Sequence, residues 1–482
     1  MSKSIKKNYI LNLVTQILTF MTPFLTAPYI ARVLNADGIG FFSYAQSISS
    51  YFTLLAVLGI NDYGRRQVAY YQDDIEKRSF YFWNIKALSF MTVTLCTAAY
   101  VIFILPRFNY HIIYILLIAN IVSNFFDVNW FFASLEQFEK IVFRNIFIRI
   151  FDVAYIFLFV HSKDDLVIYA FGMVLVNFFM NVCLCGMLPK YIKKPDFSKI
   201  RPFTDFKVIL TLFLPAISVT LFSSIDKTML GVLSKSPFEN GYYEQTMKLV
   251  NMALAVITSV SVVVSPRIGY LVEKKDFEQI KGYMLKTFQF IFLLAFPMMF
   301  GLIAIVPFFI PWFYGQGFEK VVILMQILSP LILFMGISKM IASQYLIQIK
   351  QENKVTLSIF IGGGINIILN YILIPRYLSV GAAIASSVSE FIVLVVTLYF
   401  VRKEFSPFLI VISSLKYLIL SILMFVILHF ISAALSPSII STLILIAFGI
   451  GIYILFLMLV RDSFCIDFFR TIRRKIFERG ME

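Results

Sequence analysis

The residues most able to do chemistry in this sequence are charged side chains placed inside long runs of apolar residues. They are Arg32, Asp127, Arg149, Asp152, Asp226, Lys227, Lys248, Lys339 and Glu390. A charge within hydrocarbon is costly, so ionisable residues in membrane segments are rare and usually mark a substrate or ion pathway. Cations in such places suit an anionic cargo, and carboxylates suit a coupling proton or sodium ion.

Four of the cations are candidates for a positively charged cavity. They are Arg32, Arg149, Lys227 and Lys248. Asp226 and Lys227 are adjacent, so on a helix their side chains point about 100° apart and are not expected to pair with each other. We expect Lys248 to meet Asp226 across the hairpin between two neighbouring helices. The alternatives are snorkelling of Arg32 to the lipid headgroups and a local ion pair of Arg149 with Asp152, three residues on.

Three further arginines fall at corresponding ends of apolar runs in the two halves of the chain. They are Arg65, Arg66 and Arg267. Because the guanidinium fork suits phosphate, they are candidates for gathering an anionic headgroup at an entrance. The alternative is simple anchoring, since basic residues collect at the cytoplasmic ends of membrane helices.

The sequence has no G-x-x-x-x-G-K-[ST] motif, so ATP bound to this chain is not expected to supply energy for whatever work the protein does. Coupling to a proton or sodium gradient is the natural alternative, with Asp127, Asp226 and Glu390 as candidate carriers. The three histidines and four cysteines lack the spacing of a metal site, so no metal and no other cofactor is expected.

The elements that position these residues are predicted to be membrane helices. Hydrophobic residues make up 60% of the 482 residues and charged residues only 14%, far from the roughly 45–50% and 25% of soluble domains. The Lys and Arg residues that give the chain its net charge of +15 lie between apolar runs rather than on one basic face. This distribution excludes nucleic acid as the partner. Fourteen apolar runs are long enough to span a bilayer. They lie near residues 8–30, 38–60, 80–105, 110–132, 142–161, 165–187, 204–233, 242–268, 283–308, 321–347, 354–375, 378–401, 408–433 and 437–460.

The distribution of basic residues predicts how these spans are oriented. With the N-terminus in the cytoplasm, the cytoplasmic segments collect 34 of the 42 Lys and Arg residues, Lys86 counted among them. This agrees with the rule that basic residues stay on the cytoplasmic side. An even number of spans then places both termini in the cytoplasm.

The two halves of the chain resemble each other, as in transporters built from repeats. Gly40-Phe41-Phe42-Ser43-Tyr44 matches Gly241-Tyr242-Tyr243-Glu244-Gln245. We therefore predict an all-α polytopic fold of about 14 helices. Two parallel six-helix repeats surround a central cavity, related by an axis along the membrane normal. The expected parts are an N-terminal bundle (1–188), a cytoplasmic linker (189–203), a second bundle (204–403), two appended helices (404–460) and a basic cytoplasmic tail (461–482).

Several motifs resemble those of the bacterial Wzx-type polysaccharide flippases, which belong to the exporter superfamily of multidrug, oligosaccharidyl-lipid and polysaccharide (MOP) transporters. They are Asn8-Tyr9-Ile10-Leu11-Asn12, the run from Pro28 to Gly40, Gly59 to Arg66, Asp226 to Gly231, and Gly381 to Ala385. The resemblance implies a multi-pass inner-membrane protein without enzymatic activity. It would move an undecaprenyl-diphosphate-linked sugar repeat unit to the outer leaflet, for O-antigen or capsular polysaccharide. It also implies that the polysaccharide polymerase and chain-length regulator of that pathway are partners.

Two other functions remain open at this point. A lipid II flippase or a multidrug exporter would have the same fold, although an exporter of organic cations favours acidic groups in its cavity, whereas the charges here are mixed. A membrane glycan polymerase handles the same lipid, but it usually carries a large outside loop or a carboxylate motif at a helix end. Neither feature is present, and the repeat has no use in such an enzyme.

Overall fold

The computed structural model describes residues 3–109 and 111–462. Within these ranges it does not describe the side chains of residues 3–17, 19, 215, 216, 219, 221–223, 262 and 263. Within these residues the secondary structure is helical and contains no strand. The α-helices are α1 Lys3–Val57, α2 Ile60–Tyr70, α3 Ile75–Phe103, α4 Ile112–Leu116, α5 Ile118–Phe126, α6 Asn129–Ser134, α7 Phe138–Phe159, α8 Leu166–Cys185, α9 Phe206–Ser234, α10 Pro237–Glu273, α11 Phe277–Phe313, α12 Glu319–Leu328, α13 Leu331–Met340, α14 Glu352–Tyr377, α15 Ser379–Phe400, α16 Pro407–Ser432 and α17 Ile439–Leu459. Short 3₁₀ turns are η1 Pro106–Phe108, η2 Lys163–Asp165, η3 Leu188–Lys190 and η4 Phe197–Lys199, and η5 Ile341–Leu346 is a π-helical segment.

Every predicted span coincides with helical structure, which confirms the all-α polytopic fold. By length and composition, ten helices in the described part of the chain are able to cross a membrane, or eleven if a bent pair forms one span. The exact number of fourteen crossings stays a prediction. Residues 463–482 of the predicted tail lie outside the described part of the chain.

The first two predicted spans lie in α1 as two helices that meet at a kink, and the second span ends just beyond Val57. The regular backbone of α1 is interrupted at Asn35, which has φ 56° and ψ 178°. Asparagine is several-fold enriched among residues with positive φ, so this position is a natural place for the helix to change direction. The helix that follows α1 starts after Gly59, whose φ is 73°. A Cβ there would lie 2.6 Å from the carbonyl oxygen of Ile209 in α9, so glycine also permits this close approach.

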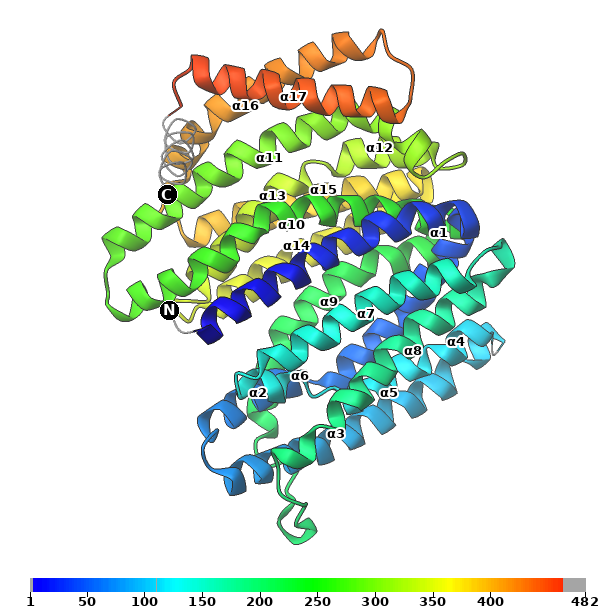
Figure 1. Ribbon diagram of the computed structural model, residues 1–482, viewed down its shortest axis with the longest axis vertical. Helices are drawn as coiled ribbons and strands as arrows, with labels where there is room; N and C mark the ends of the chain where they lie inside the picture. The colour runs from blue at the N-terminus through cyan, green and yellow to red at the C-terminus, as the bar shows by residue number, and fades with distance from the viewer. Residues whose placement is uncertain (1–2, 110, 463–482) are drawn as a thin grey trace. The chain divides into compact units, whose positions relative to one another are not determined.

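The helices form two compact units, and the first contains Met1–Glu244 together with Ile367–Ala382. In this unit α1 packs against α3, α7 and α9, and α5 packs against α3 and α8. Figure 1 shows α3, α5 and α8 lying side by side. Phe82, Trp130 and Phe131 are the centre of a buried apolar cluster that joins α3 to α6.

The second unit contains Gln245–Asn366 and Ala383–Glu482. Its long helix α11 packs against the appended helices α16 and α17, which also pack against each other (Figure 1). The α12 and α13 helices are bent by 42° at Ser329–Pro330, where a proline interrupts the run. The predicted boundaries of the two bundles and the linker stay a prediction.

Candidate functional site

An ion pair within the first unit holds Lys227, one of the four cations predicted for a positively charged cavity. Lys227 of α9 lies with its Nζ 2.6 Å from Oε2 of Glu244, on the first turns of α10. The side chains are 25% and 17% exposed, so the pair is neither fully buried nor freely solvated. Lys227 is seven residues from the end of α9 at Ser234, which places it about 10 Å along the helix from that end.

Hydroxyl groups of α1 surround this ion pair. Ser43 donates from Oγ to Oε2 of Glu244 at 3.0 Å. One turn on, the hydroxyls of Ser47 and Tyr51 lie 2.9 and 2.8 Å from the hydroxyl of Thr228, the neighbour of Lys227. The spacing of these residues places them on one face of α1, toward α9. Together they form a polar seam between α1, α9 and the start of α10, which we call the Lys227 seam.

Carboxylates next to the Lys227 seam are buried and hydrogen-bonded. Asp226 is 6% exposed, and its two oxygens accept from Tyr243 Oη at 2.7 Å and from Asn370 Nδ2 at 2.6 Å. Glu239 accepts from the backbone N–H of Ser379 at 3.0 Å. Asp226 and Lys227 thus point to different partners, as their adjacency predicts. The carboxylate oxygens of Asp226 and Glu239 are therefore buried groups to which a proton or a hard cation could bind.

Two glycines allow the helices of the Lys227 seam to cross closely. A Cβ at Gly40 would lie 1.7 Å from the carbonyl oxygen of Pro237 and 2.6 Å from the backbone nitrogen of Gly241. A Cβ at Gly241 would lie 1.9 Å from the carbonyl oxygen of Ala36. Gly40 and Gly241 correspond in the predicted repeat, and so do Ser43 and Glu244. Residues that contact their own counterparts are what a two-fold axis between the repeats would produce.

The remaining predicted cations are placed separately. Arg149 forms the local ion pair that was the alternative for it, with Nη1 3.9 Å from Oδ2 of Asp152. Arg32 lies exposed on α1, close to the irregular Asn35. Lys248 lies half-buried on α10 in the second unit, and its predicted contact with Asp226 stays a prediction.

The predicted entrance arginines are exposed, as an entrance requires. Arg65 and Arg66 lie on α2, and Arg267 lies on α10 with its guanidinium 5.3 Å from the ring centre of Tyr270. The exposure of these arginines is compatible with both predicted roles, membrane anchoring and headgroup binding.

Of the other predicted ion carriers, Glu390 is 6% exposed on α15. Asp127 lies between α5 and α6, where the predicted fourth span is broken. Its Oδ1 accepts from the backbone N–H and the side-chain amide of Asn129, the first residue of α6, at 2.9 and 2.7 Å.

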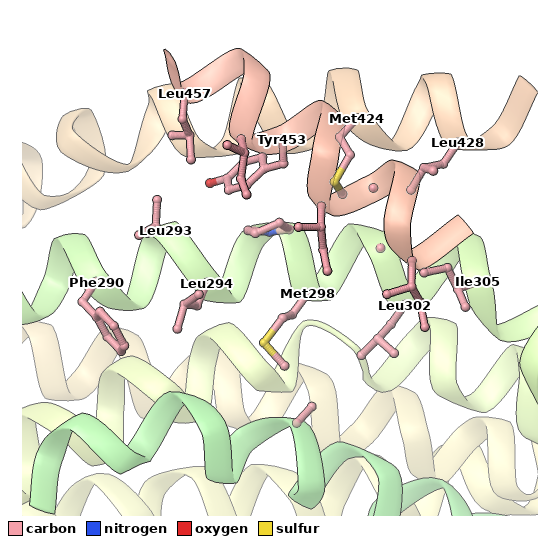
Figure 2. A pocket seen from close by; sticks show the side chains of 17 residues that line it. Phe290, Leu293, Leu294, Met298, Leu302, Ile305, Met424, Leu428, Tyr453 and Leu457 are labelled. Carbon is pink, nitrogen blue, oxygen red and sulfur yellow. The ribbon is translucent and has the colours of Figure 1, made fainter. Parts of the chain in front are cut away.

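The second unit contains an apolar cavity of about 530 Å³ between α11, α16 and α17. Figure 2 shows side chains from all three helices that line it, among them Met298 and Leu302 of α11, Met424 of α16 and Leu457 of α17. Tyr453 carries the one polar side chain among the lining residues. A cavity of this size lies in the roughly 300–1,000 Å³ range of small-molecule sites, and its lining suits a hydrocarbon.

Two functional residues were missed by sequence reasoning. Glu244 was matched to Ser43 in the repeat but was not considered as a partner of Lys227. The recurrence of Ser43, Ser47 and Tyr51 at helical spacing is the signal that could have located this polar face. Lys86 was counted with the cytoplasmic segment, whereas it is buried within α3 at 7% exposure.

Comparison with known proteins places the chain in a family. The model of the family described as "Polysaccharide biosynthesis protein" matches residues 5–272, more than half of the chain. A protein of Escherichia coli (strain K12) named "Putative O-antigen transporter" is 22% identical over 408 residues, which cover 83% of this chain and 97% of that protein.

Solved structures with the same fold are transporters. The lipid II flippase MurJ in an inward closed conformation has a TM-score of 0.74 at 18% identity, covering 95% of this chain and 99% of that one. An inward-facing multidrug resistance MATE family transporter of the MOP superfamily has a TM-score of 0.61 at 12% identity, covering 81% and 97%. The chain is a multi-pass membrane protein by its long apolar helices, and it shares its fold with the flippase and MATE structures. Because the family model matches more than half of it, the chain belongs to the polysaccharide biosynthesis protein family.

Proposed function

We propose that this protein flips an undecaprenyl-diphosphate-linked oligosaccharide from the cytoplasmic to the outer leaflet of the bacterial inner membrane. Both termini lie in the cytoplasm in this proposal. The glycan serves O-antigen or capsular polysaccharide, and the polymerase and chain-length regulator of the same pathway act next. The family and the transporter fold support the class of cargo.

The observation that carries a lipid-linked cargo is the apolar cavity of the second unit. It is built largely from α16 and α17, which lie beyond the two predicted six-helix repeats, and from the face of α11 that they cover (Figure 2). A polyprenyl tail has to remain in an apolar environment while its headgroup crosses. The cavity offers hydrocarbon contacts with a single polar side chain in its lining, so in this proposal a segment of the tail lies there.

The diphosphate needs a cation in a position that the cargo can reach. Lys227 is paired with Glu244, and a carboxylate on a side chain can give way to a phosphate oxygen when the helices rearrange. In the proposed cycle Lys227 binds Glu244 when the cargo is absent and the diphosphate during transfer. Arg65, Arg66 and Arg267 gather the headgroup at the cytoplasmic entrance.

Coupling to a proton or sodium gradient completes the proposal. The buried carboxylates Asp226 and Glu390 are the proposed carriers, since each is 6% exposed within a helix of the bundle. Transport into proteoliposomes that is indifferent to both gradients would remove this part of the proposal and leave the cargo unaffected.

The test is deletion of the gene in its native host, followed by measurement of undecaprenyl-linked intermediates and of surface polysaccharide. Complete repeat units are expected to accumulate on the cytoplasmic face, and the wild-type gene should reverse this. The Gly301→Phe variant should fail to do so, because Gly301 lines the cavity and its nearest neighbour is the flexible end of Met424 at 3.8 Å. The ring then fills the space reserved for the tail.

The matched control is Gly451→Phe on α17. This glycine is exposed and has nothing within 4 Å of an added Cβ, so the substitution should preserve complementation. Normal surface polysaccharide in the deletion strain, with new sensitivity to cationic dyes, would mean that the cargo is a drug. Accumulation of peptidoglycan precursors instead would assign lipid II.

A further inference from the structure

The break between α5 and α6 leaves backbone carbonyl groups without helical partners in the last third of the predicted span 110–132. α5 ends at Phe126, Asp127 is extended with φ −68° and ψ 116°, and α6 begins at Asn129. The last turn of a helix has no N–H groups for its carbonyls, and the helix dipole concentrates negative partial charge there. Such a break inside a membrane protein requires a compensating donor or cation.

Lys86 of α3 supplies that cation. Its Nζ donates to the carbonyl oxygen of Phe125 in a short hydrogen bond and to the carbonyl oxygen of Asp127 at 3.3 Å. The ammonium also lies 5.2 Å from the ring centre of Phe125 and 5.9 Å from that of Phe82. These contacts surround a charge that is 93% buried with oxygen atoms and aromatic faces.

A small cavity lined by both polar and apolar residues lies beside the ammonium. Its volume is about 10 Å³, and Asn61, Ser89, Asn124 and Asp127 line it together with Lys86. This volume is close to the minimum that holds one water molecule, which could accept the third N–H of the ammonium. The carbonyls, the nearby carboxylate and the amide oxygens make a set of hard oxygen ligands.

In transporters, unwound backbone carbonyls and the C-terminal ends of broken helices commonly coordinate a monovalent cation. We propose that the α5–α6 break is a cation site whose resident ion is the tethered ammonium of Lys86, which holds the break in shape without a free ion. Lys86 is thus a positioning residue of the transporter. Removing its side chain converts the break into a site for a free monovalent cation, preferably a primary ammonium ion. The inference does not depend on which cargo is carried.

The test is chemical rescue of the purified full-length protein in detergent. The melting temperature of the Lys86→Ala variant is measured against propylammonium chloride and sodium chloride, with choline chloride at equal ionic strength as the reference. Propylammonium should raise the melting temperature along a saturable curve, by roughly 1–2 °C at tenfold excess over its dissociation constant. The wild type should not respond, because its own ammonium fills the site.

Two further variants separate a cation site from a general loss of packing. Lys140→Ala removes another lysine of the first unit, which lies 3.8 Å from the ring centre of Tyr191 and contacts no helix break. Its melting temperature should not respond to propylammonium. Adding Asp127→Ala to Lys86→Ala should raise the dissociation constant of propylammonium about tenfold, because the double variant also lacks the carboxylate near the cation.

A folded Lys86→Ala protein whose melting temperature ignores both cations would overturn the proposal. If Lys86→Ala yields no folded protein, Lys86→Arg and Lys86→Met decide, by the fraction recovered as a monodisperse species. A cation site predicts high recovery for arginine and low recovery for methionine, and equal recovery of the two would also overturn it.

Discussion

Two lysines in long apolar helices of the first unit differ in what holds them. Lys227 is 25% exposed and binds the side-chain carboxylate of Glu244, whereas Lys86 is 7% exposed and binds backbone carbonyls at the α5–α6 break. A side-chain partner can rotate away and release the cation to a phosphate. Backbone carbonyls at a helix break move only with the helices. The same residue type can therefore serve a cargo in one place and the shape of the fold in the other.

The largest expected difference between the two sites is in stability. Lys86→Met leaves two carbonyls and the neighbouring Asp127 carboxylate without their cation, and it should lower the free energy of unfolding by about 3 kcal/mol. Lys227→Met removes a partly solvated ion pair and should cost about 1 kcal/mol or less. Denaturant titration of both purified variants measures the difference. If both variants lose a similar amount of unfolding free energy, the proposed difference between a lysine held by backbone carbonyls and one held by a side-chain carboxylate is wrong.

The close crossing of α1 and α10 supports only the Lys227 seam, so damage to it should leave the Lys86 site intact. Gly241→Ala places a Cβ where the carbonyl oxygen of Ala36 lies, 1.9 Å away, and backbone cannot yield as a side chain can. The expected cost is about 1–3 kcal/mol, with loss of transport.

The control for this substitution is Gly282→Ala on α11, which has nothing within 4 Å of the added Cβ. It should be neutral or slightly stabilising, because alanine favours helix over glycine. Equal melting temperatures and equal transport for the two variants would contradict the close crossing.

A charge swap separates the two roles that Lys227 combines. Lys227→Glu and Glu244→Lys should each lower stability by about 1 kcal/mol, and the double variant should recover most of this because the 2.6 Å pair can form again. Transport should stay lost in the double variant, since the cation now lies on α10 rather than α9. Recovery of transport, measured by complementation of the deletion strain, would show that the pair acts only as a link between helices.

The helices were predictable from sequence because hydrophobic length is a local property, and each apolar run lies in helical structure. Breaks within a run, such as those that divide 110–132 into α4, α5 and α6, were not predicted. The charged candidates Asp226 and Lys227 were also found, since a charge in an apolar run is conspicuous. Lys86 was not, because its partners are backbone carbonyls and a helix break has no residue signature as clear as a proline. Glu244 was missed for a different reason. Its partner lies on another helix, 17 residues away, and the contact depends on the crossing at Gly40 and Gly241.

The smallest expected effect concerns Arg149, a third cation of the first unit, whose partner is only three residues away. Its side chain is 37% exposed, and its Nη1 lies 3.9 Å from Oδ2 of Asp152, which is 3% exposed. At this distance, and with one partner largely solvated, the ion pair stabilises weakly. Arg149→Gln should therefore change the free energy of unfolding by no more than about 0.5 kcal/mol and leave complementation intact. A variant that melts normally but fails to restore surface polysaccharide would give Arg149 the role proposed for Lys227, that of a cation that contacts the cargo. The local pair would then be its resting partner, as Glu244 is for Lys227.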